Sequence, residues 1–313
     1  MKPVDVVCLC QLYDVHGMFG PHFAEDNPWV RLVKPEDVAD PRAIRHALAF
    51  SPGPEDFAPY PNLQMVSSVG AGVDALLDHP GLDHEIRISR SIIEDQAKMI
   101  ACFALYYIAG WQRRMWGYPE QQAREGWAIL NLTPPNHFKV GVLGTGKIGG
   151  ELARALVGLG YQVTGYGSRA RQEVGYPVLS GPEGLSTIAA ESHAVVNLLP
   201  LTDETRGVLN AGFFAQMRAD AILIQLGRGG HLVEADLLAA LEAGRPALAA
   251  LDVFAHEPLA PGHPFWSHPK VMVTPHVAGD ADFAVTARFI AEGIAAHERG
   301  EAPKGLVSRD RGY

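Results

Sequence analysis

Three polar side chains that could carry out acid–base chemistry follow three apolar segments in the last third of the chain. They are Arg228, Glu257 and His276. A histidine can donate a proton near neutral pH, and a carboxylate on its other ring nitrogen raises the basicity of the imidazole. An arginine offers a planar fork that suits a carboxylate next to a carbonyl. Together these residue types indicate reduction of a ketone or 2-oxoacid, with His276 as the proton donor, Glu257 as its partner and Arg228 as the substrate anchor.

A second histidine competes for the role of the base. His256 directly precedes Glu257, but its neighbours predict a loop rather than the mouth of a strand. Each of these polar residues taken alone could also be structural. Their joint occurrence after successive strands favours a catalytic group with His276 as the base, because ligands bind beyond the carboxyl ends of parallel strands.

A glycine-rich turn predicts a nucleotide site. It joins a predicted buried strand, residues 138–143, to a predicted helix, residues 151–159, with the spacing G-x-G-x-x-G. Such glycines allow a tight turn, close approach to a pyrophosphate and close packing of the helix, whose N-terminus favours phosphate. The alternative is a purely structural glycine turn. The predicted contacts are Gly144, Gly146, Lys147, Ile148 and Gly149.

The end of the next predicted strand, residues 162–166, favours NADP(H) over NAD(H). An NAD site usually has Asp or Glu there for the ribose 2′-hydroxyl. This chain instead has Ser168, Arg169 and Arg171, which could bind a 2′-phosphate by charge-assisted hydrogen bonds. The alternative is a solvated surface turn.

Regular alternation of strands and helices predicts an α/β fold with two doubly wound domains, a Rossmann domain inserted in a flavodoxin-like domain. The expected strands are residues 4–10, 30–33, 47–51, 64–66, 86–88, 139–143, 162–166, 194–197, 221–225, 247–251 and 271–273. The expected helices include residues 94–115 as a bridge between domains, 234–243, and 283–299 as a helix that packs back on the first domain. The predicted domains are residues 1–100 with 283–313 for substrate, and residues 101–282 for NADP, including the bridging helix and an arm at 116–136.

Composition narrows the function classes. The 313 residues include 26 Lys and Arg against 35 Asp and Glu, a net charge of −9. This balance disfavours nucleic-acid and anionic-membrane partners and favours a cytoplasmic protein. The apolar run 4–10 is too short to span a membrane and lacks signal-peptide features. Cys8, Cys10 and Cys102 are expected to be buried free thiols, and no spacing of His and Cys indicates a metal.

The segments around the polar triad resemble the D-isomer-specific 2-hydroxyacid dehydrogenase family. They are L-G-R-G-G-H-L-V-E-A-D-L around Arg228, L-D-V-F-A-H-E-P-L around Glu257 and V-T-P-H-V-A-G around His276. The resemblance runs from about residue 60 to the C-terminus. Residues 67–74, 168–171, 197–202 and 309–313 resemble the glyoxylate/hydroxypyruvate reductase A group within that family.

The resemblance implies roles for further residues. It implies that the triad acts as described above and that the group favours NADPH. It also implies that the backbone N–H groups of Gly70, Ala71 and Gly72 hold the substrate carboxylate. The alternative for these three residues is a plain strand-to-helix turn. Arg90 falls near the pocket in such reductases, or makes a surface salt bridge. The remaining implied cofactor contacts are Pro200, Thr202, Asp252, opposite the nicotinamide amide, and Gly279.

The expected activity is therefore NADPH-dependent reduction of small 2-oxoacids such as glyoxylate and hydroxypyruvate. The alternatives are a reductase for larger 2-oxoacids such as phenylpyruvate, and a non-enzymatic nucleotide sensor. Residues 1–60 match the group poorly, and residues 50–52 stand where a bulky pocket residue is expected, so the accepted side chain stays open. The resemblance, together with the arm at 116–136, implies a homodimer, and Trp127 fits either that contact or a core position.

Overall fold

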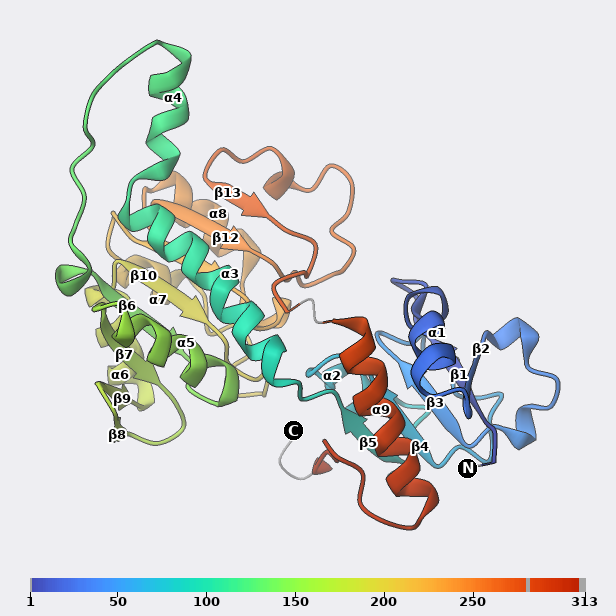
Figure 1. The fold of residues 1–313 in the computed structure, drawn as a ribbon. Coiled ribbons are helices and arrows are strands. Elements are labelled where there is room, and N and C mark those ends of the chain that lie inside the picture. Colours follow the sequence, from blue (N-terminus) through green and yellow to red (C-terminus); the bar gives the residue numbers. More distant parts are fainter. Residues whose placement is uncertain (1, 280–281, 310–313) are drawn as a thin grey trace. The chain divides into compact units, whose positions relative to one another are not determined.

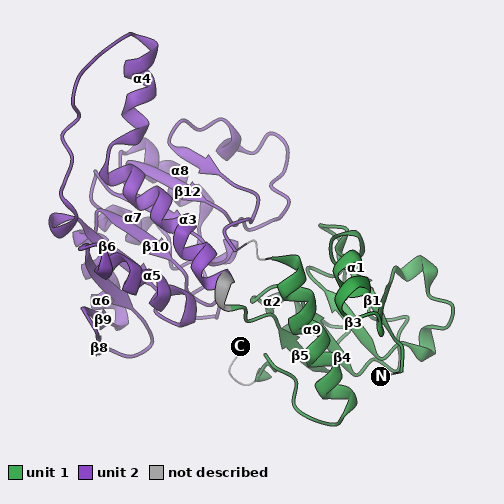
Figure 2. Cartoon of the chain, in the orientation of Figure 1, with its two compact units in different colours: residues 1–94, 281–313 green, residues 95–280 purple. Residues whose placement is uncertain are grey.

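The chain divides into two compact units. The computed structural model describes residues 2–279 and 282–309, and of Asp74, Glu94 and Asp95 only the backbone. One unit comprises residues 1–94 and 281–313, and the other comprises residues 95–280 (Figures 1 and 2). The sequence placed these boundaries after residues 100 and 282. The terminal segment 310–313, which contributed to the family resemblance, lies outside the described residues.

The first unit is built on a five-stranded parallel sheet in the order β2-β1-β3-β4-β5. This is the doubly wound order whose switch point lies between the first and third strands. The strands are β1 (Val4–Leu9), β2 (Val30–Val33), β3 (His46–Ala49), β4 (Met65–Ser68) and β5 (Arg87–Arg90). The helices are α1 (Val15–Asp26), α2 (Asp74–Leu77) and α9 (Phe283–Glu298).

Both faces of this sheet are buried, which explains its nearly continuous apolar strands. Successive side chains of β1 alternate between faces. Val6 packs with α1 and α9, and Val7 packs with the loops and short helix of the opposite face. In α1, Asp14 caps the N-terminus by accepting a hydrogen bond from the Gly17 N–H at 3.0 Å. Helix α9, at the far end of the chain, thus completes the core of the first unit (Figure 1).

The second unit has an eight-stranded sheet in the order β13-β12-β11-β10-β6-β7-β9-β8. The strand order reverses between β6 and β10, so their carboxyl ends form the switch point of a Rossmann sheet. Its strands are β6 (Lys139–Leu143), β7 (Gln162–Tyr166), β8 (Arg171–Glu173), β9 (Tyr176–Leu179), β10 (Ala194–Asn197), β11 (Ile222–Gln225), β12 (Leu248–Leu251) and β13 (Val271–Val273).

Helices cover both faces of the second sheet. One core joins α3 and α5 to the sheet, and the other joins α6, α7 and α8 to its opposite face (Figure 1). The helices are α3 (Glu94–Gln112), α4 (Tyr118–Ala123), α5 (Lys147–Gly158), α6 (Gly181–Glu191), α7 (Ala211–Gln216) and α8 (Glu234–Glu242). Single 3-10 turns occur at Pro35–Asp37, Pro41–Ala43, Met115–Gly117, Pro135–His137, Gly229–His231 and Pro264–Trp266.

The predicted α/β class with two doubly wound sheets is confirmed. The predicted strands did not include a hairpin in which β8 runs antiparallel to β9 at the edge of the sheet. Its strands are short, and Gly175 turns between them with φ +87°. Because β8 is polar and only three residues long, no periodicity marks it as a strand. The hairpin matters because it carries Arg171.

Candidate active site

The glycine turn lies at the switch point of the second sheet. Gly144 has φ +92°, and a Cβ there would lie 2.5 Å from the Leu198 carbonyl oxygen. A Cβ at Gly149 would lie 1.9 Å from the Gly144 carbonyl oxygen, so α5 packs closely on the turn. At Gly146, by contrast, a Cβ meets no protein atom within 4 Å. The turn therefore presents open space at its middle glycine and backbone contact at the other two, which fits a pyrophosphate seated on the N-terminus of α5.

The predicted 2′-phosphate residues follow β7. Ser168 and Arg169 are exposed. Arg171 Nη2 donates to the Thr145 carbonyl oxygen at 3.1 Å and to Thr145 Oγ1 at 3.0 Å, inside the glycine turn. Its Nε also donates to Glu173 Oε1 at 2.6 Å. No carboxylate directly follows β7 in the sequence, but the hairpin places Glu173 against Arg171, so this guanidinium is already paired with a carboxylate.

A histidine–carboxylate pair lies at the other end of the site. His276 Nδ1 is 2.8 Å from Glu257 Oε2, and the Phe254 N–H donates to Glu257 Oε1 at 3.0 Å. Burial alone would raise the pKa of Glu257, but the hydrogen bond and charge of His276, the Phe254 N–H and the charge of Arg228 together lower it. Glu257 is therefore held as a carboxylate. Because His276 Nδ1 faces that carboxylate, it carries a proton, and Nε2 is the nitrogen left to exchange protons with a substrate.

The loop that carries His276 is fixed by a buried acid. Asp252, 1% exposed, accepts hydrogen bonds at Oδ1 from Thr274 Oγ1 at 2.6 Å and the Val277 N–H at 3.0 Å, and at Oδ2 from the Ala278 N–H at 2.9 Å. Its carbonyl oxygen accepts from the His276 N–H at 2.9 Å, and His276 has φ +57°. Burial raises the pKa of Asp252 despite these bonds. Asp252 thus shapes the His276 loop, in addition to the nicotinamide role that the resemblance implies.

The rest of the predicted second-unit site lies on neighbouring loops. Arg228 follows β11, and its positive charge helps lower the pKa of Glu257. The Pro200 carbonyl oxygen accepts from Thr205 Oγ1 at 2.7 Å, and the Thr202 N–H donates to the same hydroxyl at 2.8 Å, which closes the loop after β10. The Gly279 carbonyl oxygen accepts from Gln96 Nε2 at 3.1 Å, which ties the end of the His276 loop to α3.

The competing histidine is not paired in this way. His256 is exposed, and Glu257 Oε2 contacts His276 instead. Sequence reasoning missed Thr274 and Glu173, which hold Asp252 and Arg171. A threonine just after β13 and an acid two residues beyond an arginine were the available signals, but neither identifies its partner.

The predicted carboxylate loop lies in the first unit. Ser68 Oγ donates to the Gly72 carbonyl oxygen at 3.1 Å and accepts from the Gly70 N–H at 3.2 Å. The Phe50 ring lies 3.2 Å from the position of a Cβ on Gly70. Arg90 ends β5 opposite Ser68 of β4. The loop is therefore a compact turn at the carboxyl edge of the first sheet, with an aromatic ring against it.

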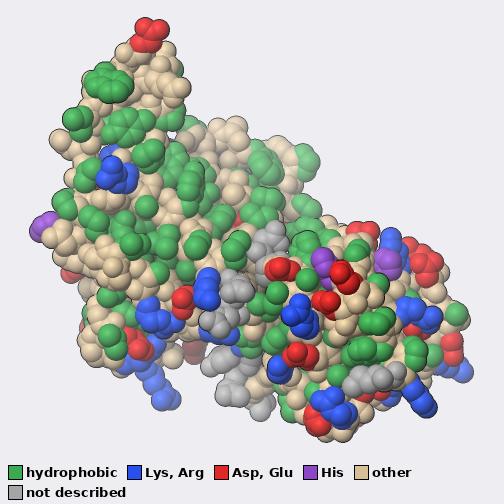
Figure 3. Space-filling view, viewed as in Figure 1, with side chains coloured by type: hydrophobic (Ala, Val, Ile, Leu, Met, Phe, Trp, Pro, Cys, Tyr) green, Lys and Arg blue, Asp and Glu red, His purple; other side chains and the backbone are tan. Residues whose placement is uncertain are grey.

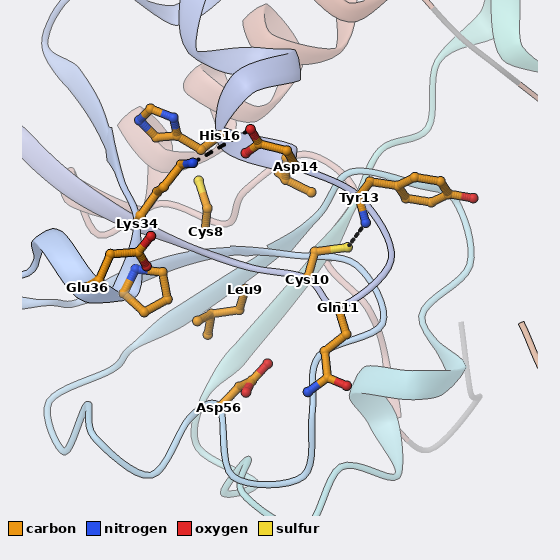
Figure 4. Close-up of a pocket in the computed structure, with 12 residues that line it drawn as sticks. Cys8, Leu9, Cys10, Gln11, Tyr13, Asp14, His16, Lys34, Glu36 and Asp56 are labelled. Atoms are coloured by element: carbon orange, nitrogen blue, oxygen red, sulfur yellow. Dashed lines mark hydrogen bonds and ion pairs between the residues drawn. The ribbon is translucent and has the colours of Figure 1, made fainter. Parts of the chain in front are cut away.

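A cavity of about 490 Å³ lies in the first unit, at the carboxyl ends of β1 and β2 (Figure 4). Lys34 Nζ is 3.7 Å from Asp14 Oδ2 on its rim. Burial raises the pKa of the Cys8 thiol to about 12, so this thiol stays protonated. Of the three expected buried thiols, Cys8 is buried, Cys10 is half-buried and Cys102 is exposed on α3, so the prediction is wrong for Cys102.

Two absences concern the described part of the chain. No group of three or more His, Cys, Asp or Glu side chains there is arranged to hold a metal ion. Likewise, none of the helices described has both the length and the apolar character needed to cross a membrane.

A dinucleotide turn at a Rossmann switch point, with a His–Glu pair and an arginine on neighbouring loops, defines the class of nicotinamide-dependent oxidoreductases. The chain belongs to the D-isomer specific 2-hydroxyacid dehydrogenase family, whose NAD-binding domain model matches residues 105–278. The predicted family and the prediction of an enzyme are confirmed.

Its relatives support this assignment along nearly the whole chain. It is 37% identical over 279 residues to a glyoxylate/hydroxypyruvate reductase A from Yersinia enterocolitica, covering 88% of this chain and 89% of the relative. A family structure from Klebsiella pneumoniae has a TM-score of 0.91 at 35% identity, with 99% of each chain covered. An NADPH-dependent glyoxylate/hydroxypyruvate reductase from Sinorhizobium meliloti, solved with NADP and sulfate, has a TM-score of 0.89 at 29% identity, covering 99% of this chain and all of the other.

The glycine turn gives a matched pair of variants. Gly146→Ala places a methyl group in the open space of the turn, so we expect a folded protein whose Kd for NADPH rises about tenfold or more. Gly149→Ala drives a Cβ into the Gly144 carbonyl, so we expect a lower Tm as well. Gly158→Ala, where a Cβ meets nothing within 4 Å, is the control. Equal NADPH affinity in Gly146→Ala and Gly158→Ala would contradict a pyrophosphate at this turn.

Proposed function

We propose that the protein reduces small 2-oxoacids such as glyoxylate and hydroxypyruvate to 2-hydroxy acids with NADPH. The observation that carries the proposal is the 2.8 Å contact between His276 Nδ1 and Glu257, with Arg228 close enough to lower the pKa of the same carboxylate. The named activities of the Yersinia and Sinorhizobium relatives support the substrate class.

Each residue of the site has a distinct role in the proposed reduction. A bound nicotinamide supplies the hydride to C2 of the oxoacid. His276 gives the proton on Nε2 to the substrate oxygen, and Glu257 fixes the ring orientation and stabilises its charged form. Arg228 binds the substrate carboxylate through its guanidinium group. In the reverse direction His276 accepts the hydroxyl proton.

Steady-state kinetics test the proposal. Oxidation of NADPH is followed with glyoxylate, hydroxypyruvate, pyruvate and phenylpyruvate as substrates. The expected order of kcat/KM places glyoxylate and hydroxypyruvate first. A higher kcat/KM for phenylpyruvate would show that the protein is a reductase of larger 2-oxoacids. No turnover with any 2-oxoacid would reject the proposal.

We also propose a preference for NADPH over NADH. Arg171 lies against Thr145 in the glycine turn, and Arg169 is exposed beside it. Replacing both arginines with Ala removes the charges offered to a 2′-phosphate. We expect the ratio of kcat/KM for NADPH to that for NADH to fall about tenfold or more, since each hydrogen bond to a charged group contributes about 1.5–3 kcal/mol. Arg218→Ala, which breaks a surface pair with Asp220, is the control, and an unchanged ratio in the double variant would oppose the assignment.

The arm after α3 supports a homodimer. Trp127 and Ile129 are 102% and 91% exposed, which excludes the core position for Trp127. Apolar side chains gather over α3 and this arm in Figure 3. Exposed apolar surface of this kind marks an interaction site, and we propose that a second copy of the chain covers it.

Light scattering tests the dimer. Wild-type protein is expected at twice the mass of the chain, and Trp127→Ser with Ile129→Ser is expected to yield monomers. Val174→Ser, an equally exposed apolar residue on the β8–β9 hairpin, should leave the dimer intact. A monomeric wild type would oppose the proposal.

The three free cysteines agree with a cytoplasmic location, which we propose as well.

A further inference from the structure

Both peptide groups of Arg228 are held by buried side chains. The Arg228 N–H donates to His231 Nδ1 at 3.0 Å, and the Arg228 carbonyl oxygen accepts from Gln225 Nε2 at 2.9 Å. His231 and Gln225 are both fully buried. The loop after β11 therefore has its backbone fixed at the residue whose side chain is assigned to the substrate.

His231 also reaches the loop that follows β10. Its Nε2 is 3.1 Å from the Pro200 carbonyl oxygen. Because Nδ1 faces an N–H donor and Nε2 faces a carbonyl, the hydrogen-bond network assigns the proton to Nε2 and the lone pair to Nδ1. A single neutral ring thus joins Arg228 to the loop that contains the predicted cofactor residues Pro200 and Thr202.

A second polar link runs parallel to the first. Gln225 Oε1 accepts from Asn197 Nδ2 at 2.7 Å, and Asn197 Oδ1 accepts from the Leu199 N–H at 3.2 Å. A Cβ at Gly227 would lie 2.9 Å from both His231 Nδ1 and Asn197 Nδ2, so the two links pack against that glycine. Asn197 and Gln225 end adjacent strands at paired positions of the sheet.

Burying this polar network costs free energy, so the need to fill space does not explain why polar side chains stand here. Burying amide and imidazole groups is unfavourable unless each is hydrogen-bonded, and apolar side chains would fill the same space without that requirement. What the polar groups add is a defined position for one backbone segment. A misplacement of about 1 Å at a substrate-binding group is enough to lower activity substantially.

We propose that His231 and Gln225 are positioning residues that fix Arg228 for the substrate carboxylate and connect it to the cofactor loop. This inference rests on the proposed function. Neither side chain needs to touch the substrate, since each acts through the Arg228 backbone.

Two replacements of His231 separate its two contacts. The side-chain oxygen of Asn can take the place of Nδ1, and the side-chain nitrogen of Gln can take the place of Nε2. His231→Asn therefore keeps the acceptor for the Arg228 N–H and loses the link to Pro200. His231→Gln keeps the donor to Pro200 and leaves the Arg228 N–H without this acceptor.

Kinetics with glyoxylate and NADPH read out the difference. In His231→Gln we expect KM for glyoxylate to rise about tenfold, with kcat and the Kd for NADPH changed less than about threefold, because substrate binding alone is weakened. His231→Asn should stay within about threefold of the wild-type KM. Gln225→Met removes the hydrogen bond to the Arg228 carbonyl oxygen and leaves His231 in place. We expect the same rise in KM for glyoxylate as in His231→Gln, so Gln225→Met can replace that variant if it does not fold.

The control is His193→Gln. His193 Nδ1 also accepts a backbone N–H, that of Lys139 at 3.0 Å, but next to the amino end of the same sheet. Wild-type KM in His231→Gln and Gln225→Met, or equal losses in His231→Asn and His231→Gln that follow only Tm, would overturn the inference. Absence of 2-oxoacid turnover in wild-type protein would instead reject the proposed function, and the inference with it.

Discussion

Replacing His276 with Ala is expected to lower kcat/KM for glyoxylate by roughly 10²- to 10⁴-fold, the contribution of a positioned general acid. The ring nitrogen that faces Glu257 is already committed at 2.8 Å, so the proton must come from the other nitrogen. Asp252 cannot take over this role, because it is buried and its carboxylate already accepts three hydrogen bonds. The Kd for NADPH should stay near the wild-type value, since the proposed phosphate contacts are made by the glycine turn and by Arg171 beside Thr145.

His256→Ala is the matched control for this variant. It removes an exposed histidine from the loop that carries Glu257 and should leave kcat/KM within about twofold, because exposed substitutions seldom perturb a structure. Near-wild-type activity in His276→Ala, or a large loss in His256→Ala, would reverse the assignment of the two histidines.

The pH dependence of stability follows from the lowered pKa of Glu257. Its folded-state pKa lies below the ordinary value because His276, the Phe254 N–H and Arg228 together outweigh the effect of burial. A carboxyl group of this kind contributes stability above its unfolded pKa, and the contribution is lost as pH falls through the folded pKa. In His276→Ala this contribution shrinks, so the gap in Tm between wild type and variant should be wider at neutral pH than in acid.

The repeating pattern of the sequence was enough to predict the sheets and the pairing of Glu257 with His276. Buried parallel strands are continuous apolar runs, and the polar residues that follow them lie at one edge by the geometry of the sheet, so Glu257 and His276 could be paired without coordinates. The β8–β9 hairpin had no such pattern. Its short polar strand is set by pairing with a neighbour, and the contact between Arg171 and Glu173 depends on that pairing.

Interactions of buried polar groups were the part that the sequence could not supply. Asp252 was assigned to the cofactor by resemblance, and its bonds to Thr274 and to the backbone after His276 emerge only when two loops meet. In the sequence, His231 and Gln225 look like ordinary polar residues near Arg228. Their roles depend on hydrogen bonds between separate strands, which have no fixed spacing along the chain.

Replacing Arg228 with Ala is the second change with a large expected effect. A bidentate guanidinium–carboxylate contact comprises two charge-assisted hydrogen bonds, each contributing about 1.5–3 kcal/mol. We therefore expect kcat/KM for hydroxypyruvate to fall roughly 10²- to 10⁴-fold, with KM raised. Arg228→Lys keeps the charge but not the planar fork, so it should recover only part of the loss.

A substrate without a carboxylate distinguishes loss of the carboxylate contact from a general loss of activity in Arg228→Ala. Dihydroxyacetone keeps the carbonyl and hydroxyl groups of hydroxypyruvate but lacks its carboxylate. If Arg228 binds that carboxylate, Arg228→Ala should lower the rate with hydroxypyruvate far more than the slow rate with dihydroxyacetone, and the preference between the two substrates should collapse. Arg218→Ala, which removes an arginine paired with Asp220 before β11, should leave both rates unchanged. Equal losses on both substrates in Arg228→Ala would mean that the arginine acts on the carbonyl or on the fold of its loop, because a carboxylate contact cannot affect a substrate that has no carboxylate.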